Sequence, residues 1–236
     1  MIDFNTRSSG TEIMDDLDCK GEIVDQTLRE LDFINHWLGG NNVTLNGLKK
    51  LIAKIDPKKD ISIADLGCGS GEMLRLITKE ARQKGRTVNM VGIDANPNIT
   101  AFAQMHSKEY RNIQFEALDI FSKEFQQRKF DVVLATLFFH HFHDEQLIAF
   151  FKQLKDQVRI GMVINDIHRH WLAYHSIRLL TKFFSKSSMV KFDAPLSVLR
   201  AFKKQEIINI LEKAGIKNYS LKWKWAFRWQ VIIETY

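Results

Sequence analysis

Histidines gather in two short stretches of this chain. Five of its eight histidines fall in residues 140–143 and 168–170 (His140, His141, His143, His168 and His170). Imidazole is the usual general base near neutral pH, and a carboxylate such as Asp166 can orient one. We expect His140 or His141, assisted by His168 or His170, to take a proton from an acceptor. In the competing interpretation, one or two of these histidines are buried and hydrogen-bonded for structure.

A second chemical signal is an acid followed by three glycines at alternate positions. It occupies residues 65–71 (Asp65, Gly67, Cys68, Gly69 and Gly71). The glycines allow a tight turn and leave room for a ligand against the main chain. A dinucleotide fingerprint would need another glycine spacing and a P-loop would need a following lysine, and neither is present. Asp65 disfavours a pyrophosphate and suits a ligand with a cationic amine.

Apolar periodicity indicates which elements position these residues. Residues 61–65 predict a buried strand, and the helical spacing after the glycines predicts strand, turn and helix. Further strands are predicted at 88–93, 113–117, 131–135 and 161–164. In an open α/β sheet, ligands lie beyond the carboxyl ends of the strands. Both histidine stretches follow such ends, so we expect them to face the same ligand site as the glycine turn.

Four ordered motifs resemble class I S-adenosylmethionine-dependent methyltransferases over roughly residues 45–165. They are Asp65-Leu-Gly-Cys-Gly-Ser-Gly71, Val91-Gly-Ile-Asp94, Ala117-Leu-Asp-Ile120 and Phe130-Asp-Val-Val-Leu-Ala135. The resemblance implies S-adenosyl-L-methionine as cofactor, with S-adenosyl-L-homocysteine as product. It also implies an α/β fold, a Rossmann-like doubly wound sheet of seven mainly parallel strands with an antiparallel C-terminal hairpin strand.

The resemblance and the strand ends together assign cofactor contacts beyond the glycine turn. Asp94 ends the second strand about 20 residues past the turn, where an acid hydrogen-bonds ribose hydroxyls; it could instead cap the next helix. Ala95 and Asn96 lie beside it. The resemblance implies that Asp119 accepts from the adenine amino group and that Ile120 packs on the ring. Ala135, at the end of the fourth strand motif, completes the predicted set.

The acceptor is less well defined by the sequence. The chain lacks the Asn/Asp-Pro-Pro-Tyr/Phe motif of enzymes that methylate amino nitrogens of bases or glutamine. It resembles small-molecule methyltransferases of quinone biosynthesis and those associated with type III polyketide synthases, at Glu12-Ile-Met-Asp-Asp16, Asn165-Asp-Ile-His-Arg-His170 and Pro195-Leu-Ser-Val198. The likeness implies methylation at oxygen or carbon of a phenol, quinol or polyketide-like acceptor. We expect Trp37, Phe139, Arg169 and His170 to bind it.

Composition limits the remaining classes. The 236 residues include no apolar run long enough to span a membrane, and the polar N-terminus does not resemble a signal peptide. Two cysteines suit a reducing compartment, so we expect a cytoplasmic protein. We expect no metal site, because the adjacent histidines of His-His-x-His rarely converge on one ion. A net charge of +6 permits contact with nucleic acid or an anionic membrane without requiring either.

We expect one methyltransferase domain over residues 1–236. Residues 1–56 would contain two helices, 22–38 and 45–55, behind a mobile arm of residues 1–20. These helices would either form a lid over the substrate or cover one edge of the sheet. Residues 57–170 would bind the cofactor, 171–192 would add an amphipathic helix, and 193–236 would add a helix and the hairpin. The amphipathic helix could be a lid on the acceptor or a membrane-surface helix, and we favour the lid.

Two other functions compete with small-molecule methylation. The basic charge permits an RNA methyltransferase, although no appended RNA-binding module is visible. A regulatory protein that binds S-adenosylmethionine without turnover would carry the same cofactor motifs. We favour the small-molecule enzyme, and the sequence leaves the oligomeric state open.

Overall fold

Seven strands form one sheet in the computed structural model, which describes residues 2–235. The spatial order is β3-β2-β1-β4-β5-β7-β6, and only β7 pairs antiparallel, with β5 and with β6. The strands are β1 (Ile61–Leu66), β2 (Val88–Asp94), β3 (Ile113–Ala117), β4 (Phe130–Thr136), β5 (Val158–Ile167), β6 (Tyr219–Lys224) and β7 (Arg228–Glu234). The expected mainly parallel sheet with its antiparallel hairpin is confirmed.

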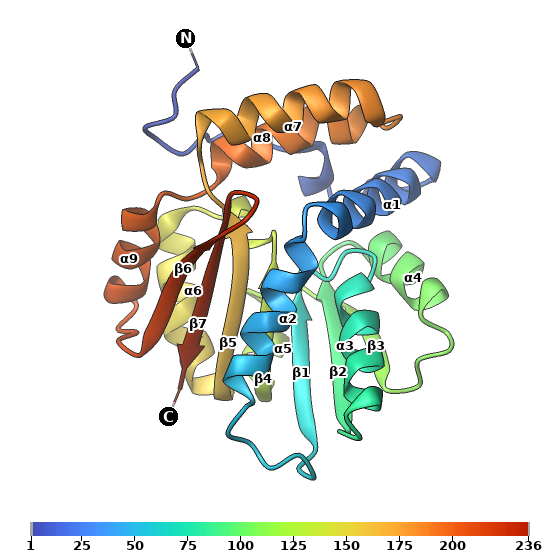
Figure 1. The fold of residues 1–236 in the computed structure, drawn as a ribbon, viewed down its shortest axis with the longest axis vertical. Coiled ribbons are helices and arrows are strands. Elements are labelled where there is room, and N and C mark those ends of the chain that lie inside the picture. Colours follow the sequence, from blue (N-terminus) through green and yellow to red (C-terminus); the bar gives the residue numbers. More distant parts are fainter. Residues whose placement is uncertain (1, 236) are drawn as a thin grey trace.

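Helices flank the sheet and cover the carboxyl ends of its strands (Figure 1). They are α1 (Glu22–Trp37), α2 (Gly40–Leu51), α3 (Glu72–Gln83), α4 (Pro97–His106), α5 (Lys123–Gln126), α6 (Asp144–Gln157), α7 (Trp171–Phe184), α8 (Ser188–Arg200) and α9 (Lys204–Lys213), with short 3-10 turns η1 (Ile13–Asp15) and η2 (Phe139–His141). The helices α1, α7 and α8 lie together beyond the strand ends. The sheet therefore presents its ligand-binding edge to a helical cover.

Alternation along the central strands divides the core into two layers. In β1, Ile61 and Ile63 pack with α2 and α3, whereas Ala64 and Leu66 pack with the layer that includes α6 and α9. Successive side chains of a strand point to opposite faces, so a strand buried on both faces needs apolar residues throughout. Burial of each large aliphatic side chain contributes about 1.5–3 kcal/mol relative to exposure. This packing fixes the strand ends that carry the site.

The helix predicted at residues 45–55 lies earlier, as α2 over Gly40–Leu51. Gly39 alone breaks the chain, with a left-handed φ of 72°, and the polar residues after it are helical. Tertiary hydrogen bonds hold this first turn, because Asn165 donates to the Gly40 carbonyl oxygen (2.9 Å) and Asn41 donates to Glu72 (2.9 Å). The local composition of this stretch could not reveal those partners.

Other boundaries also differ from expectation. The insertion after β5 holds two helices, because Ser187 caps a new helix, α8, by accepting from the Val190 N–H (3.2 Å). The helix α6 begins at Asp144, with His143 as its N-cap residue. The strand β5 continues to Ile167, since pairing with β7 extends along its whole end. The chain therefore stays in the sheet up to the residue before His168, three residues beyond the strand end that the sequence predicted.

Residues 2–20, expected to be a mobile arm, pack against the body of the protein. Arg7 donates to Asp144 Oδ1 (2.6 Å) and to the carbonyl oxygen of Phe142 (2.8 Å). The N–H groups of Ile13 and Met14 donate to the Asp193 carboxylate at 2.8 and 3.1 Å. These bonds bring the N-terminal segment over the carboxyl ends of the strands.

Candidate functional site

A cavity of about 1150 Å³ lies beyond the carboxyl ends of the strands. Its walls come from the N-terminal segment, α1, the glycine turn, the loops after β2, β3 and β4, the helices α7 and α8, and the β6–β7 turn. Ligand pockets commonly measure about 300–1,000 Å³. The cavity therefore has room for a nucleoside-sized ligand and a second small molecule.

The glycine turn forms one wall with its main chain. Gly67 has φ of +64°, and a Cβ at that residue would lie 2.1 Å from Phe138 Cδ2. Its N–H donates to the Ile93 carbonyl oxygen at 2.8 Å, which joins the turn to the end of β2. Only glycine combines this left-handed conformation with this close approach. Gly67, Cys68 and Gly69 all line the cavity as predicted.

Two acids lie beside the turn, the buried Asp65 at the end of β1 and the half-buried Asp94 at the end of β2. Asp65 is 2% exposed, and within the described chain its Oδ1 has no hydrogen-bond partner. Burial, reinforced by the nearby charge of Asp94, raises the pKa of Asp65 to about 7. Asp94 accepts from the N–H groups of Gly69 (3.4 Å) and Asn96 (3.1 Å), and burial raises its pKa. An amine and a hydroxyl pair are ligand groups that would satisfy these oxygens.

The remaining predicted cofactor residues divide into two groups. Ala95, Asp119 and Ile120 line the cavity. Three others stand outside its lining (Gly71, Asn96 and Ala135). Asn96 caps α4 by accepting from the Asn98 N–H (2.8 Å) and donates to the Cys19 carbonyl oxygen (3.0 Å). The alternative role of Asp94 as the cap of α4 is therefore wrong.

An acid of α1 joins this part of the cavity without having been predicted. Asp32 accepts from Ser70 Oγ at 2.7 and 2.6 Å, and its nearest cation is Arg75 Nη2 at 3.8 Å. Burial raises the pKa of Asp32 to about 7. In sequence, Asp32 stands inside an amphipathic helix, where an acid usually faces water. Its place in the cavity depends on how α1 packs over the glycine turn.

His140 is the most enclosed of the predicted catalytic residues. It is 3% exposed, and its Nδ1 lies 2.7 Å from Asp166 Oδ1. The His140 N–H also donates to Asp166 Oδ2 at 3.2 Å. Burial alone would raise the pKa of Asp166, but its interactions with His140 outweigh burial and lower it. Asp166 therefore stays ionised and fixes the imidazole, while Nε2 has no hydrogen-bond partner within residues 2–235.

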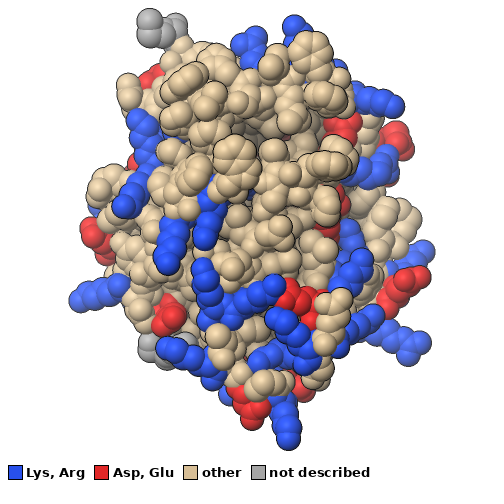
Figure 2. Space-filling view, in the orientation of Figure 1, with Lys and Arg blue, Asp and Glu red and all other residues tan. Residues whose placement is uncertain are grey.

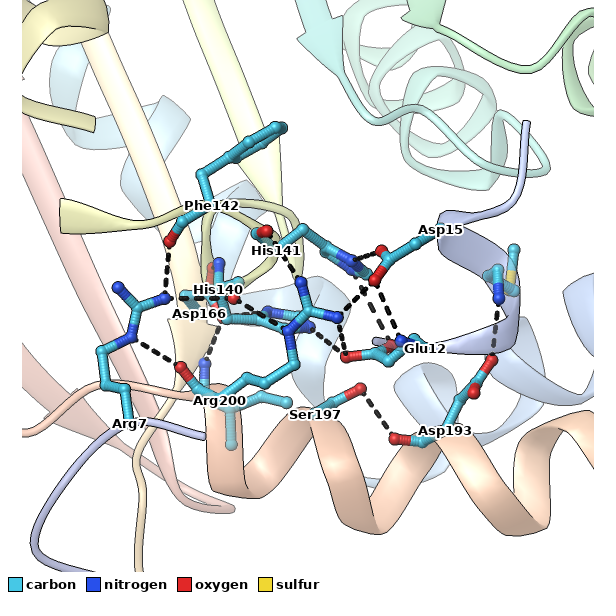
Figure 3. Close-up of polar contacts among 12 residues, drawn as sticks. Arg7, Glu12, Asp15, His140, His141, Phe142, Asp166, Asp193, Ser197 and Arg200 are labelled. Carbon is cyan, nitrogen blue, oxygen red and sulfur yellow. Dashed lines mark hydrogen bonds and ion pairs between the residues drawn. The ribbon is translucent and has the colours of Figure 1, made fainter. Parts of the chain in front are cut away.

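His141 forms a second histidine–carboxylate pair with the N-terminal segment (Figure 3). Its Nδ1 lies 2.6 Å from Asp15 Oδ1, and Asp15 Oδ2 accepts from Arg200. Burial opposes ionisation of Asp15, but the bonds from His141 and Arg200 dominate and hold its pKa well below the usual value. The two Nδ1 atoms are thus tied to carboxylates, which leaves both Nε2 atoms on the side of Glu12.

Glu12 faces both histidines and was missed as a site residue. Its Oε1 lies 3.7 Å from His140 Nε2, and its Oε2 lies 4.0 Å from His141 Nε2. Burial raises the pKa of Glu12 to about 7. Glu12 and Asp15 were the first and fourth residues of a motif noted only for its resemblance. Their spacing of three residues places both on one 3-10 turn, η1, beside the histidines.

This trio also has the spacing of a metal site, because ligand atoms of Glu12, His140 and His141 lie within 4.8 Å of one another. However, Arg200 Nη1 lies 3.6 Å from Oε1 of Glu12. A fixed guanidinium there opposes a second cation. The arrangement suits proton transfer better than metal binding, and the absence of a metal stays a prediction.

The structure places five predicted acceptor or catalytic residues away from the cavity lining (Trp37, Phe139, His168, Arg169 and His170). Phe139 packs in the core against Phe150 and Phe151. Arg169 is 1% exposed, and its guanidinium donates to internal carbonyl oxygens and to Glu206. A guanidinium with these partners has a structural role, which corrects its predicted contact with an acceptor.

The other three residues also have local roles. His168 accepts from Trp223 Nε1 at 3.3 Å, and burial, reinforced by the charge of His170, lowers its pKa to about 4. His170 caps α7 by accepting from the Leu172 N–H at 3.2 Å. Trp37 is 72% exposed at the end of α1. We expected His168 or His170 to assist His140, but the titratable groups that lie next to His140 are Asp166 and Glu12.

Comparisons with known proteins agree with this architecture. A family model described as a methyltransferase domain matches residues 57–215. A carboxy-S-adenosyl-L-methionine synthase of Campylobacter jejuni subsp. doylei is 26% identical over 211 residues, which are 83% of this chain and 85% of that protein. One from Helicobacter pylori is 22% identical over 176 residues, covering 70% and 71% of the two chains.

Solved structures share the fold. The plantazolicin methyltransferase BpumL, in complex with a monoazolic desmethyl analogue and SAH, superposes with a TM-score of 0.63 at 20% identity, covering 89% of this chain and 88% of that one. Human N-acetylserotonin methyltransferase in complex with SAM gives 0.60 at 16% identity, covering 89% and 55%. S-adenosylmethionine is the cofactor that this fold and the family match indicate. The chain belongs to the methyltransferase domain family and has the class I S-adenosylmethionine-dependent methyltransferase fold.

Proposed function

We propose that this protein transfers a methyl group from S-adenosylmethionine to an oxygen or carbon of a small hydrophobic aromatic acceptor, such as a phenol, a quinol or a polyketide-like ring. The buried His140–Asp166 pair carries the proposal, because His140 belongs to the wall of the cavity that the glycine turn also lines, and its unpartnered imidazole nitrogen is buried there beside Glu12.

The cofactor half of the proposal rests on the acids and the glycine turn. Bound S-adenosylmethionine would supply a methyl group already activated by its sulfonium charge. Asp65 would accept from the amino group, Asp94 would accept from the ribose hydroxyls, and Ile120 would pack against the adenine ring. Asp119, which accepts from the Phe121 N–H (2.9 Å), keeps its second oxygen for the adenine amino group.

The acceptor half rests on the histidine–carboxylate cluster. Asp166 accepts from Nδ1–H of His140, so the lone pair of that ring lies on Nε2 and can take the acceptor's proton. Glu12 and His141, which face the same position, would orient the acceptor hydroxyl. The enclosing N-terminal segment would exclude water during the displacement. Phe138 offers an aromatic wall in place of the core residue Phe139.

The test is incubation of the full chain with S-adenosylmethionine labelled in its methyl group. One pool of acceptors would contain alkylated phenols and quinols, and a second pool would contain total RNA. We expect label in the first pool, with the acceptor identified by mass spectrometry. Label in RNA would contradict the proposed acceptor class.

Single substitutions then test the base. His140→Gln should leave cofactor affinity unchanged and slow methyl transfer by roughly 100-fold or more. Asp166→Asn should slow it as well, because the ring loses its fixed orientation. His36→Gln, in α1 and outside the cavity lining, is the matched control. Normal turnover by His140→Gln and His141→Gln together would show that neither histidine is the base.

Two further outcomes separate the competing functions. Conversion of the cofactor itself, without a methylated acceptor, would match the named activity of the carboxy-S-adenosyl-L-methionine synthases. Tight cofactor binding without any product from either pool would favour the regulatory function. Both outcomes contradict the proposal, and mass analysis of the cofactor pool distinguishes them.

A further inference from the structure

Large apolar side chains are exposed on three elements that line one end of the cavity. The elements are α1, α7 and the β6–β7 turn, which contribute Ile34, Ile177 and Phe227 to the lining. Six neighbouring side chains are each at least 59% exposed (Phe33, Trp37, Leu179, Phe183, Phe184 and Trp225), and we call them the apolar rim. Large exposed apolar side chains gathered around a cavity are typical of an interaction site.

The geometry of α7 shows that this exposure is systematic. Successive residues of a helix turn by about 100°, so Leu172, Leu179 and Phe183 share one face. The lining residues Leu180 and Ile177 lie about 80° and about 140° around the same helix from Leu172. One side of α7 therefore closes the cavity while the adjacent side presents apolar groups to solvent. A helix that only closed the cavity would need apolar residues on the cavity side alone.

Basic side chains border the apolar rim. Lys224 ends β6 directly before the rim residue Trp225, and Lys222 lies two residues earlier on the same strand. The pKa of Lys50 of α2 is lowered by burial and by the like charges of these two lysines. On the other side, Lys182 and Lys186 are exposed on and after α7. Within residues 2–235, none of these five lysines has a carboxylate oxygen within 4 Å. Figure 2 shows an uncharged, hollowed upper face with lysine and arginine side chains below and beside it.

We propose that the apolar rim and its bordering lysines dock this protein on an anionic phospholipid bilayer, with the mouth of the cavity toward the lipid. Tryptophan and phenylalanine side chains insert at the boundary between headgroups and acyl chains. Lysines beside them attract anionic headgroups. An acceptor dissolved in the bilayer could then enter the cavity without crossing water.

The charge argues for lipid over a second copy of the chain. Two copies meeting through this face would bring their unpaired lysines together, and the whole chain carries a net charge of +6. Like charges at an interface disfavour association, whereas an anionic surface is complementary to them. No described helix is long and apolar enough to cross a bilayer, so the contact would be peripheral.

The experiment is co-sedimentation of the full chain with vesicles of phosphatidylcholine alone and of phosphatidylcholine mixed with phosphatidylglycerol. We expect binding to the mixed vesicles that weakens as salt is raised, and much weaker binding to phosphatidylcholine. The double variant Phe183→Ser/Phe184→Ser should lower partitioning at least ~10-fold, because two exposed phenyl rings no longer insert. Lys222→Glu/Lys224→Glu should lower it only on the anionic vesicles.

Matched controls exclude a general effect of substitution. Met105→Ser replaces an apolar residue of α4 that is 51% exposed, and Lys123→Glu reverses an exposed charge on α5. Both should bind as the unchanged protein does, and circular dichroism should show all variants folded. Absence of vesicle binding would overturn the proposal, as would binding that the rim variants do not weaken. Self-association lost in Phe183→Ser/Phe184→Ser, without vesicle binding, would identify the rim as a contact between copies.

Discussion

Asp65 and Asp94 are the residues on which the proposed cofactor recognition most directly depends. They lie at adjacent strand ends, Asp65 buried and Asp94 half-buried, and both have raised pKa values because their charge is poorly solvated. A buried carboxylate without a full set of partners costs free energy until a ligand supplies them. The unpartnered oxygen of Asp65 therefore makes the empty protein less stable and favours binding of a cationic amine.

Asp94→Ala should weaken binding of S-adenosylmethionine by about 1–3 kcal/mol, because a buried ribose contact is lost. Isothermal titration calorimetry measures this change directly. Asp56→Ala, in the exposed turn before β1, is the control and should bind normally. Unchanged affinity in Asp94→Ala would contradict the assignment of the ribose site.

Affinity for S-adenosylmethionine should rise with pH up to about 7, the pKa of Asp65. Below that pH the carboxyl is protonated and attracts the amino group only weakly, so affinity should fall by up to about ten-fold per pH unit. Titrations across this range measure the slope. Asp65→Asn should bind more weakly at pH 7 and should have a flatter profile, whereas a profile like that of the unchanged protein would exclude Asp65 as the titrating group.

Among the structural elements, the N-terminal segment forms part of the wall of the site. It brings Glu12 and Asp15 to His140 and His141, which precede α6, and Arg7 and Arg200 hold it in place. Arg200 Nη2 donates to the His141 carbonyl oxygen at 2.7 Å. The proposed base and the acids beside it thus come from the cofactor-binding core and from the segment that precedes it.

Arg7→Ala should loosen this segment without disturbing the sheet. Arg7 donates to three acceptors on the loop that carries the histidines, so its loss should lower stability by about 1–3 kcal/mol. Limited proteolysis should cut the variant faster within residues 2–20. Arg29→Ala, whose partner Glu22 is highly exposed, is the control and should behave as the unchanged protein. Equal cleavage rates would show that Arg7 does not fasten the segment.

For the whole molecule, buried acids dominate the dependence of stability on pH. Glu12, Asp32 and Asp65 have folded-state pKa values of about 7, above their ordinary values near 4. Through these three acids the folded protein binds more protons than the unfolded chain between these values, and His168, with its pKa lowered to about 4, offsets only part of that excess. Asp15 and Asp166 have lowered pKa values, so the stability that they contribute is lost only at more acidic pH.

The free energy of unfolding of the cofactor-free protein should accordingly fall as pH rises from about 4.5 to about 7, on the order of a few kcal/mol. Denaturant unfolding at closely spaced pH values measures the change. Asp32→Asn and Asp65→Asn should each flatten the profile, because an amide does not titrate. Stability that rises across this window would show that these acids ionise without penalty. Saturating S-adenosylmethionine should reduce the fall by pairing with ionised Asp65.

Local patterns in the sequence were enough to predict the parts of this protein that depend on local geometry. Apolar runs indicated the strands because a strand buried on both faces needs apolar side chains at every position. Glycines at fixed spacing, with acids ending β1 and β2, indicated the cofactor edge because strand ends of a parallel sheet share one edge. His140 and His141 were predicted to lie near that edge for the same reason, because they follow β4 closely in the sequence.

The groups that surround those histidines could be identified only from the tertiary structure. Asp15 meets His141 across 126 positions of the chain, and that contact depends on long-range packing that no local pattern encodes. His140 lines the cavity whereas His168 and Arg169 lie outside its lining, although all three follow strands. This difference also depends on long-range packing. The exposed side of α7 shows the same limit: periodicity predicts an amphipathic helix, but what covers each face depends on its neighbours in space.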